Sequence, residues 1–359
     1  MPSIPAKHSV TRDDVARACG VSGALVSYVF SSNARNKVKP DTREKILRTA
    51  EKMGYRPSLI GRSLKTRRSY NIALLLPESF ARSVSLHQLR IFHGVCLAMQ
   101  ETDYRPMIFF GVNEKLFRTL EARRVDGIVG LDSRVDLKFL DALLPFHLPL
   151  VMANVEYHAS AEFPVASVRS DHEGWVHDRL DELAAAGCRR ILQIEANPDG
   201  CQPNGMMKRA FLAEMRARRH AGVRGEVYSP APVPSERAVA RLHEFFSGAS
   251  PCDGVLIDGQ EWLSPLLETA REHRVPLTPE VNCFTVESSV FTRPLWLHDS
   301  VAIGRRAWLK LADLLENRPT APVDKVPYYF ARTPQEIRTG TTAESEESIS
   351  GQPERQPAL

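Results

Sequence analysis

The chain lacks any long run of apolar residues. Its longest apolar stretch, residues 72–77, has the length of a strand and falls far short of the ~20 residues of a membrane-spanning helix. The N-terminus also lacks the apolar segment of a secretory signal. The sequence therefore predicts a cytoplasmic protein with no membrane partner.

Motifs that carry chemistry are also missing. The six cysteines are scattered without a C-x-x-C pair, which favours buried thiols in a reducing compartment over disulfides or a zinc site. The phosphate-binding patterns G-x-G-x-x-G and G-x-x-x-x-G-K-[ST] are absent, as are H-E-x-x-H and G-x-S-x-G. The 11 histidines show no metal-ligand spacing. We therefore expect no enzyme, no metal and no cofactor.

Positive charge is concentrated at one end of a chain of otherwise ordinary composition. At 359 residues, 43% hydrophobic and 25% charged, the chain is typical of a globular protein with two or three domains. Residues 1–70 contain 15 Lys and Arg against 5 Asp and Glu, a net charge of +10, whereas the whole chain carries only +4. The remainder is therefore acidic. A basic segment on an acidic body is typical of nucleic-acid binders, because each neutralised phosphate releases counterions.

The basic segment predicts two short helices joined by a tight turn. Thr11 and Asp14 have the spacing of a capping box, Gly20 supplies the turn, and Ser22 can cap the second helix. Both helices have apolar positions at helical spacing, namely Val15, Ala16 and Cys19, then Leu25, Val26 and Val29. This is the helix-turn-helix pattern, whose second helix enters the DNA major groove. A helical hairpin that only buries a core is the alternative.

A third helix is predicted at Pro40-Asp41-Thr42-Arg43-Glu44. Asp41 and Glu44 again have the spacing of a capping box, and Gly54 is placed to end the helix before Pro57. Its apolar positions are Ile46, Leu47, Ala50 and Met53. Residues 57–64 can form a further short helix, which has too little apolar surface to be stable alone.

These residues together resemble the lactose-repressor (LacI/GalR) family of bacterial transcription regulators. The motifs that carry the resemblance are Asp14-Val15-Ala16, Gly20-Val21-Ser22, Val26-Ser27, Thr42-Arg43, Gly54-Tyr55-Arg56-Pro57 and Arg62-Ser63-Leu64. The resemblance implies a helix-turn-helix domain at 1–56, a hinge helix and linker at 57–70, and a core at 71–340. The composition of residues 341–359, with Glu among Ser, Gln and Pro, predicts a disordered tail.

The resemblance also implies which residues contact DNA. Those expected on phosphates are Thr11, Ser22 and Ser27, and those expected to face bases are Gly23, Ala24 and Tyr28. In the hinge, Leu64 would enter the minor groove as an apolar wedge beside Arg62. Packing of Leu64 inside the body is the alternative.

The chain departs from the family pattern in the second helix. Tyr28 stands where arginine is usual, and Leu25 stands where threonine is usual. Bidentate reading of guanine by arginine is therefore not expected from this helix. Residues 32–37 form a longer connection than in the lactose repressor, and Arg35 can take over some contacts.

From residue 71 onward, short apolar runs alternate with helical patterns. The predicted strands are 72–76, 107–110, 127–130, 150–152, 191–194, 254–257, 283–286 and 295–297, and the predicted helices are 92–101, 175–186, 206–218 and 263–273. This alternation predicts parallel sheets flanked by helices. The family resemblance implies an α/β core of two lobes, like the periplasmic-binding proteins, behind the all-α headpiece. The N-terminal lobe would be about 71–169 and 299–327, and the C-terminal lobe about 170–298 and 328–340.

A ligand site is expected between the lobes, beyond the carboxyl ends of the strands. The candidate effector-binding residues are Glu78, Asn154, Met207, Tyr228, Trp262, Glu287 and His298. Met207 occupies a place where relatives commonly carry arginine, and core packing is the alternative for Trp262. The site would bind a small molecule, with carbohydrate as the candidate class. Alternatively, the body binds nothing and serves only for dimerisation.

Taken together, these features predict a homodimeric regulator of transcription, a repressor by family habit. It would bind a near-palindromic operator with an affinity that a small-molecule effector modulates. An effector-independent architectural DNA-binding protein is the first alternative. The second is an enzyme or transport-type binding protein built on the two-lobed body, against which the basic headpiece and the missing catalytic motifs argue.

Overall fold

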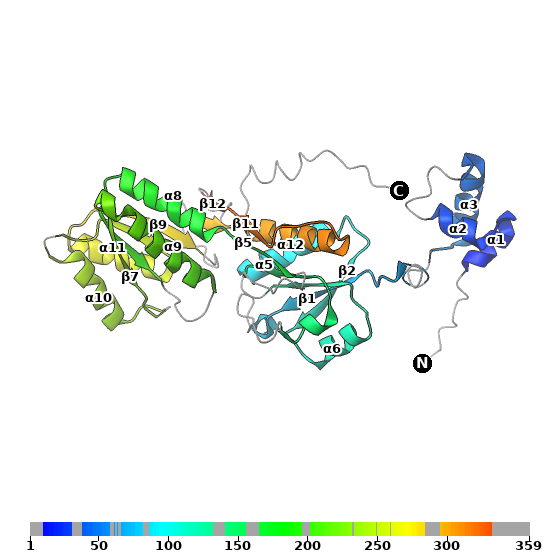
Figure 1. The fold of residues 1–359 in the computed structure, drawn as a ribbon, viewed down its shortest axis with the longest axis horizontal. Coiled ribbons are helices and arrows are strands. Elements are labelled where there is room, and N and C mark those ends of the chain that lie inside the picture. The colour runs from blue at the N-terminus through cyan, green and yellow to red at the C-terminus, as the bar shows by residue number, and fades with distance from the viewer. Residues whose placement is uncertain are drawn as a thin grey trace. The chain divides into compact units, whose positions relative to one another are not determined.

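The computed structural model describes residues 10–30, 38–57, 61, 63, 66–81, 86–131, 141–155, 165–195, 202–231, 233–248, 250–258, 260–283 and 295–331. They belong to two compact units, one containing residues 1–68 and the other residues 69–350 (Figure 1). Each unit has its own buried apolar core.

The first unit, the headpiece, is built of three helices. These are α1 (Arg12–Cys19), α2 (Gly23–Val29) and α3 (Pro40–Met53). Their core consists of the side chains predicted from helical spacing, with Val15, Val26 and Ile46 fully buried. The predicted capping box of Asp41 and Glu44 is wrong. Lys39 is the N-cap residue and makes no side-chain cap, because Pro40 begins the helix, and Glu44 accepts a hydrogen bond from Arg48 instead, at 2.6 Å.

The second unit contains two six-stranded sheets. The first sheet has the order β11-β5-β4-β3-β1-β2, and all of its described strand pairs are parallel. Its strands are β1 (Asn71–Leu76), β2 (Arg105–Phe110), β3 (Gly127–Gly130), β4 (Leu150–Ala153), β5 (Val165–Ser170) and β11 (Val323–Val326). The helices that accompany it are α5 (Leu86–Met99), α6 (Glu114–Glu121) and α12 (Ser300–Leu315), with short 3₁₀ turns at Glu78–Ala81 and Leu144–Phe146.

The second sheet has the order β12-β10-β9-β8-β6-β7. Its strands are β6 (Arg190–Ile194), β7 (Arg224–Tyr228), β8 (Gly254–Ile257), β9 (Thr278–Cys283), β10 (Leu295–His298) and β12 (Tyr328–Ala331). The helices are α8 (His172–Ala185), α9 (Gln202–Arg218), α10 (Glu236–Phe246) and α11 (Leu263–Glu272), with 3₁₀ turns at Arg219–Ala221 and Gln260–Trp262. Only β12 pairs antiparallel, with β10, among the strand pairs described.

The chain passes three times between the sheets. It leaves the first sheet after β5 and enters α8, returns from β10 into α12, and passes directly from β11 to β12. The predicted two-lobed α/β core is therefore confirmed. Four strands were not predicted, namely β5, β7, β11 and β12, and β9 begins at Thr278 rather than 283.

Helices α5 and α12 pack against each other without intervening side chains at one point. A Cβ atom on Gly304 would lie 2.0 Å from the carbonyl oxygen of Ile91, and one on Gly94 would lie 2.2 Å from that of Val301. Only glycine permits such an approach of two backbones. Helix α12 thus joins the core of β1, β3 and α5 through Ile303, Ala307 and Trp308, although more than 120 residues of the second lobe precede it in the chain.

Candidate nucleic-acid interface and ligand-binding residues

The turn between α1 and α2 has the geometry that the sequence predicts. Thr11 caps α1: its backbone N–H donates to Asp14 Oδ2 at 2.9 Å, and the backbone N–H of Asp14 donates to Thr11 Oγ1 at 3.3 Å. Gly20 ends the helix in the left-handed conformation, at φ 68°. Ser22 then caps α2 by accepting from the Leu25 N–H at 3.2 Å. Local hydrogen bonds therefore fix where both helices begin.

Helix α2 divides its residues between the core and the outer surface. Val26 and Val29 are buried, whereas Ser22 and Ala24 are exposed and Gly23, Ser27 and Tyr28 are partly exposed. A Cβ on Gly23 would meet the side chains of Asp13 and Arg12, at 2.6 and 2.8 Å. All six residues predicted to contact DNA through α1 and α2 thus lie outside the headpiece core. Arg35, Arg62 and Leu64 lie outside the described residues.

Basic side chains of the headpiece hold the helices together as well as supplying charge. Lys45 on α3 donates to the carbonyl oxygen of Cys19 at 3.0 Å, which ties the end of α1 to α3. Arg12 pairs with Asp13 at 3.0 Å, and Arg17 lies 3.6 Å from Asp14. These exposed pairs contribute little to stability, so most of the positive charge stays available to a polyanion.

Three of the predicted effector residues are part of hydrophobic cores. Met207 packs in the core of α8 and α9 and is 1% exposed. Trp262 is fully buried, and its Nε1–H donates to the Ala231 carbonyl at 3.0 Å. Tyr228 donates its hydroxyl proton to the Ala238 carbonyl at 2.7 Å. For Trp262, this placement favours the alternative of core packing; a role of these three side chains in ligand binding stays a prediction.

The other candidates have more varied surroundings. Glu78 follows β1 and is exposed, beside Gly111. Asn154 follows β4 with a left-handed backbone, at φ 66°, and its buried side chain lies next to His87. His298 ends β10 and is 3% exposed. Glu287 lies outside the described residues.

Polar side chains that the sequence analysis overlooked lie at the carboxyl ends of the second sheet. Glu195 follows β6, is 1% exposed, and accepts from Lys208 Nζ at 3.1 Å and from Ser229 Oγ at 2.7 Å. Asp258, 5% exposed, follows β8. The sequence does indicate these two residues, because each carboxylate comes directly after an apolar strand, at the end of the sheet where α/β folds bind ligands.

Three buried histidines come together where the chain passes between the sheets. His172 lies in the first turn of α8, His298 at the end of β10, and His87 in the first turn of α5. The His298 ring lies 5.0 Å from that of His87 and 5.8 Å from that of His172, measured between centroids. Burial lowers the pKa of His87 to about 4 and that of His172 to about 3, and it holds the pKa of His298 well below the ordinary value. All three rings are therefore neutral at pH 7.

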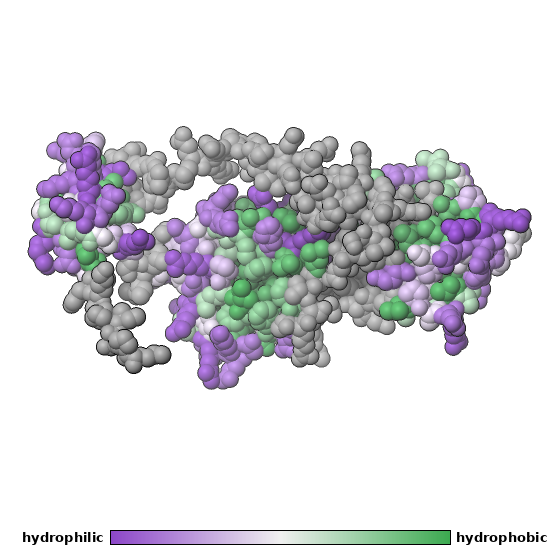
Figure 2. Space-filling view, turned by 180° about the vertical axis from the view of Figure 1, so that it is seen from behind, coloured by the Kyte–Doolittle hydropathy of each residue, from purple (hydrophilic) through white to green (hydrophobic). Residues whose placement is uncertain are grey.

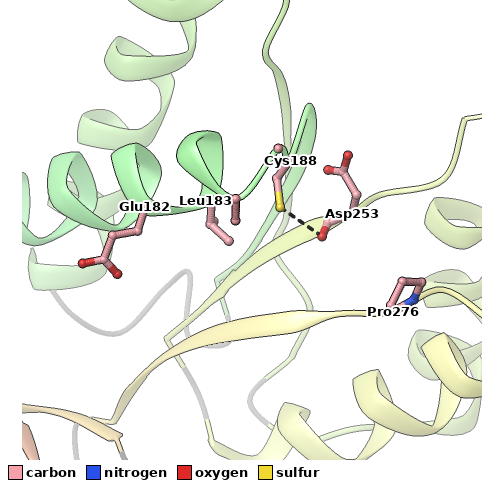
Figure 3. Close-up of a pocket in the computed structure, with 7 residues that line it drawn as sticks. Glu182, Leu183, Cys188, Asp253 and Pro276 are labelled. Atoms are coloured by element: carbon pink, nitrogen blue, oxygen red, sulfur yellow. Dashed lines mark hydrogen bonds between the residues drawn. The ribbon is translucent and has the colours of Figure 1, made fainter.

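A pocket of about 450 Å³ lies at the opposite, amino-terminal end of the second sheet. Its lining includes Cys188 and Asp253, whose backbone carbonyl accepts from the thiol at 3.4 Å (Figure 3). The Asp253 carboxylate accepts from the backbone N–H groups of Arg189 and Arg190. Burial raises the pKa of the Cys188 thiol, so it is a weak nucleophile. The thiol therefore does not mark the pocket as a reactive site.

The described residues contain neither a metal-binding cluster nor a membrane-spanning helix. No group of three His, Cys, Asp or Glu side chains is placed to hold a metal ion among them. No helix in the described ranges is both long and apolar enough to cross a membrane.

Comparison with known proteins points to one family. The family model described as "Bacterial regulatory proteins, lacI family" matches residues 11–58. The catabolite control protein A of Priestia megaterium is 27% identical over 190 residues, which is 51% of this chain and 54% of that protein. The HTH-type transcriptional regulator PtxS of Pseudomonas plecoglossicida is 30% identical over 227 residues, 62% of this chain and 64% of that protein. The match to these relatives thus spans between about half and two thirds of their length.

Solved structures extend the likeness over most of the chain. The lac repressor dimer bound to operator and the anti-inducer ONPF has a TM-score of 0.59 at 18% identity, covering 90% of this chain and 98% of that one. A complex of the transcriptional regulator CelR with cellobiose has a TM-score of 0.53 at 21% identity, covering 90% and 99%. At these identities the likeness shows a common fold of headpiece and two-lobed core.

Proposed function

Because the chain belongs to the lacI family of bacterial regulatory proteins, we propose that it regulates transcription by binding DNA in a sequence-specific manner and is not an enzyme. The observation that carries this proposal is the headpiece. Two capped helices meet at the left-handed Gly20, and the small polar face of α2 stays outside the core. This face belongs to a segment of net charge +10. A helical hairpin that only buries a core does not account for this concentration of positive charge.

The residue roles follow from chemistry and position. We assign Thr11, Ser22 and Ser27 to phosphates, because hydroxyl groups outside the headpiece core can donate to phosphate oxygens. Gly23 and Ala24 would let α2 approach the bases closely, and Tyr28 would supply the polar group of that face. Arg35, Arg62 and the Leu64 wedge complete the proposed contacts from segments next to the helices.

A small molecule is the proposed regulator of this binding. Carboxylate, amide and hydroxyl groups lie at the carboxyl ends of both sheets, including Asn154, Glu195 and Asp258. Such groups suit a neutral, hydroxylated ligand such as a carbohydrate. The ligand would change DNA affinity by binding one arrangement of the lobes better than another.

A second copy of the chain is the proposed protein partner. Strand β2 is an edge strand of the first sheet, and its apolar residues Ile108 and Phe110 have exposed fractions of 45% and 43%. Leu89 on α5 is 42% exposed, and apolar side chains gather on one face of this lobe (Figure 2). Edge strands are usually protected by charge or proline, so an apolar edge indicates a covered interface. A twofold dimer would match a near-palindromic operator.

The test is a selection of genomic fragments by the purified full-length protein at physiological salt, followed by sequencing. We expect enrichment of one near-palindromic motif. The Tyr28→Ala variant should lose the preference at particular base positions, whereas Ser27→Ala should weaken retention of all fragments alike, because a phosphate contact carries no base information.

The other outcomes are equally informative. Retention of fragments without a shared motif would contradict sequence-specific regulation and favour the architectural DNA-binding protein. If the wild type and a variant lacking residues 1–70 retained fragments equally well, the headpiece assignment would be wrong. Loss of retention on raising the salt concentration is expected for the wild type, since phosphate contacts release counterions.

A further inference from the structure

The three passages of the chain between the sheets meet at four buried side chains. Ser170 ends β5, His172 begins α8, His298 ends β10 and Tyr328 begins β12. Their exposed fractions are 0%, 0%, 3% and 8%. We refer to this set as the crossing relay. Each of the three passages contributes at least one member, although 128 residues separate Ser170 from His298.

The four side chains form one continuous line of polar contacts. Ser170 Oγ lies 2.6 Å from His298 Nδ1, His298 Nε2 lies 3.4 Å from the Tyr328 hydroxyl, and that hydroxyl lies 2.8 Å from His172 Nδ1. Both nitrogens of His298 are thus engaged, each with a different passage. The backbone holds the line in place, because His298 and Tyr328 are register partners of the antiparallel β10–β12 pair and the Asp171 N–H donates to the Val326 carbonyl at 2.8 Å.

A neutral imidazole carries one N–H, and this fact gives the relay a direction. In the first arrangement Ser170 donates to His298 Nδ1, His298 Nε2–H donates to Tyr328, and Tyr328 donates to His172 Nδ1. In the second arrangement every bond reverses, so that His172 Nδ1–H donates to Tyr328 and His298 Nδ1–H donates to Ser170. The two arrangements contain the same number of protons. They differ in the tautomer of both histidines and in whether the Ser170 proton is used within the relay.

Surrounding groups permit both arrangements. Charges near the relay are already matched, since Arg169 donates to both oxygens of Glu173 at 2.8 Å, and Lys325 lies 3.4 Å from Glu173 and 3.7 Å from Asp171. The ring of His87 also lies next to the relay, 5.0 Å from that of His298 between centroids. Its Nδ1 atom, however, lies 2.7 Å from Ser300 Oγ, which is not a relay member. In the described part of the chain, His172 Nε2 has no partner, so its protonation is not fixed by an outside bond.

We propose that the crossing relay couples the three passages as a single hydrogen-bonded unit with two directions, and that it thereby sets the angle between the lobes. The proposal deepens the proposed function, because lobe movement is the step by which a ligand would reach the headpiece. Ser170, His172, His298 and Tyr328 act as positioning residues, since all four belong to the second unit and none to the headpiece. In this proposal, movement at one passage changes the bond that the next passage makes, and the two directions of the relay are the two states that such coupling requires.

The test uses the full-length protein with histidine labelled by ¹⁵N, and it needs no ligand. Tyr328→Phe removes the central hydroxyl but keeps the ring in place. Tyr228→Phe is the matched control, because it also removes one buried phenol bond, to the Ala238 carbonyl within the second lobe. In Tyr328→Phe we expect the imidazole ¹⁵N signals of both His172 and His298 to shift and their tautomers to change. We also expect the Asp171 amide to exchange with solvent at least tenfold faster.

The control should leave the signals of His172 and His298 and the exchange of Asp171 unchanged. The proposal is overturned if Tyr328→Phe moves neither histidine, or if it speeds exchange equally at all amides as a general loss of stability would. A functional arm uses the DNA fragment enriched in the selection: Tyr328→Phe should change affinity for that fragment several-fold without changing affinity for random DNA. An absence of any enriched fragment would count against the proposed function alone, since the spectroscopic results do not depend on DNA.

Discussion

Gly304 marks the point where the backbones of α5 and α12 touch. A methyl group there would lie 2.0 Å from the Ile91 carbonyl oxygen, so Gly304→Ala must push the helices apart. We expect a loss of about 1–3 kcal/mol in the free energy of unfolding, the usual cost of overpacking. Thermal unfolding of the full chain measures it.

Gly205→Ala is the control for this substitution. Gly205 also lies within a helix, α9, but the nearest atom to its added methyl group is the flexible end of Arg209, at 3.4 Å. Alanine should therefore stabilise this helix by about 0.5–1 kcal/mol. A rise in melting temperature for both variants would mean that α5 and α12 have room between them.

The buried histidines predict a loss of stability in mild acid. Burial lowers the pKa of His87 from 6.5 to about 4 and that of His172 from 6.5 to about 3. Between pH 6.5 and these lowered pKa values, the unfolded chain binds more protons than the folded chain. The stability that the neutral rings contribute is therefore fully present above pH 6.5 and is lost as the pH falls. Each histidine should cost about 2 kcal/mol between pH 7 and pH 5. Urea unfolding at the two pH values measures the difference.

The carboxylate of Glu173, which is close to His172 in the chain, does not obscure this window. Burial alone would raise the pKa of Glu173, but the hydrogen bonds from Arg169 are the main cause that lowers it to about 2. The stability that ionised Glu173 contributes is therefore lost only at a pH below this window. His87→Gln should flatten the pH dependence in part, because it removes one titrating ring. An equal free energy of unfolding at pH 7 and pH 5 in the wild type would contradict the neutral, buried state of these rings.

At the scale of the element, helix α1 depends on its cap. Thr11 accepts from the Asp14 N–H and so satisfies a donor that the helix leaves free. Thr11→Ala should destabilise the headpiece by about 1 kcal/mol. Lys39→Ala is the matched control, because Lys39 holds the same position before α3 and makes no side-chain cap. Helical circular dichroism of the full chain during urea titration, read in the headpiece transition, distinguishes the two. Equal effects would show that the Thr11 bond contributes nothing.

Elements fixed by local chemistry were predictable from the sequence, and elements fixed by distant contacts were not. Thr11, Gly20, Ser22 and Gly54 were assigned correctly, because capping and left-handed turns involve residues a few positions apart. The third-helix cap at Asp41 was wrong, since Lys39 is the N-cap residue and Pro40 begins the helix. Strand β11 carries Asp324 and Lys325, so no apolar run indicated it, whereas the apolar run of β12 is only four residues long.

The same distinction applies to the site residues. The surface of α2 follows from helical spacing, which separates Val26 and Val29 from their neighbours. The crossing relay could not be predicted, because its members are joined by contacts across 128, 156 and 30 residues. Trp262 and Tyr228 were chosen as aromatic side chains near strand ends, and only packing reveals that their polar atoms bond backbone carbonyls.

At the scale of the whole molecule, the apolar edge of the first sheet predicts a dimer. Ile108→Lys places a charge in the proposed interface and should convert the dimer to a monomer, because a buried unpaired charge costs several kcal/mol, roughly. Sedimentation equilibrium gives the mass. Val233→Lys makes the same change at a residue that is 75% exposed on the other lobe, and it should leave the dimer intact. A monomeric wild type, or a dimeric Ile108→Lys, would exclude this face as the interface.

The contact between α5 and α12 also bears on the order in which the protein forms during synthesis. Helix α12 and strand β11, residues 300–326, complete the core that β1 and α5 begin more than 200 residues earlier. A ribosome delivers the chain from its N-terminus, so the first lobe must wait for almost the whole chain before its helix α5 and strand β5 are covered. The headpiece, by contrast, has all of its core within residues 10–55 and can fold while the rest is still being made. A nascent chain is therefore expected to acquire the surface proposed to contact DNA well before it acquires the lobes proposed to regulate it.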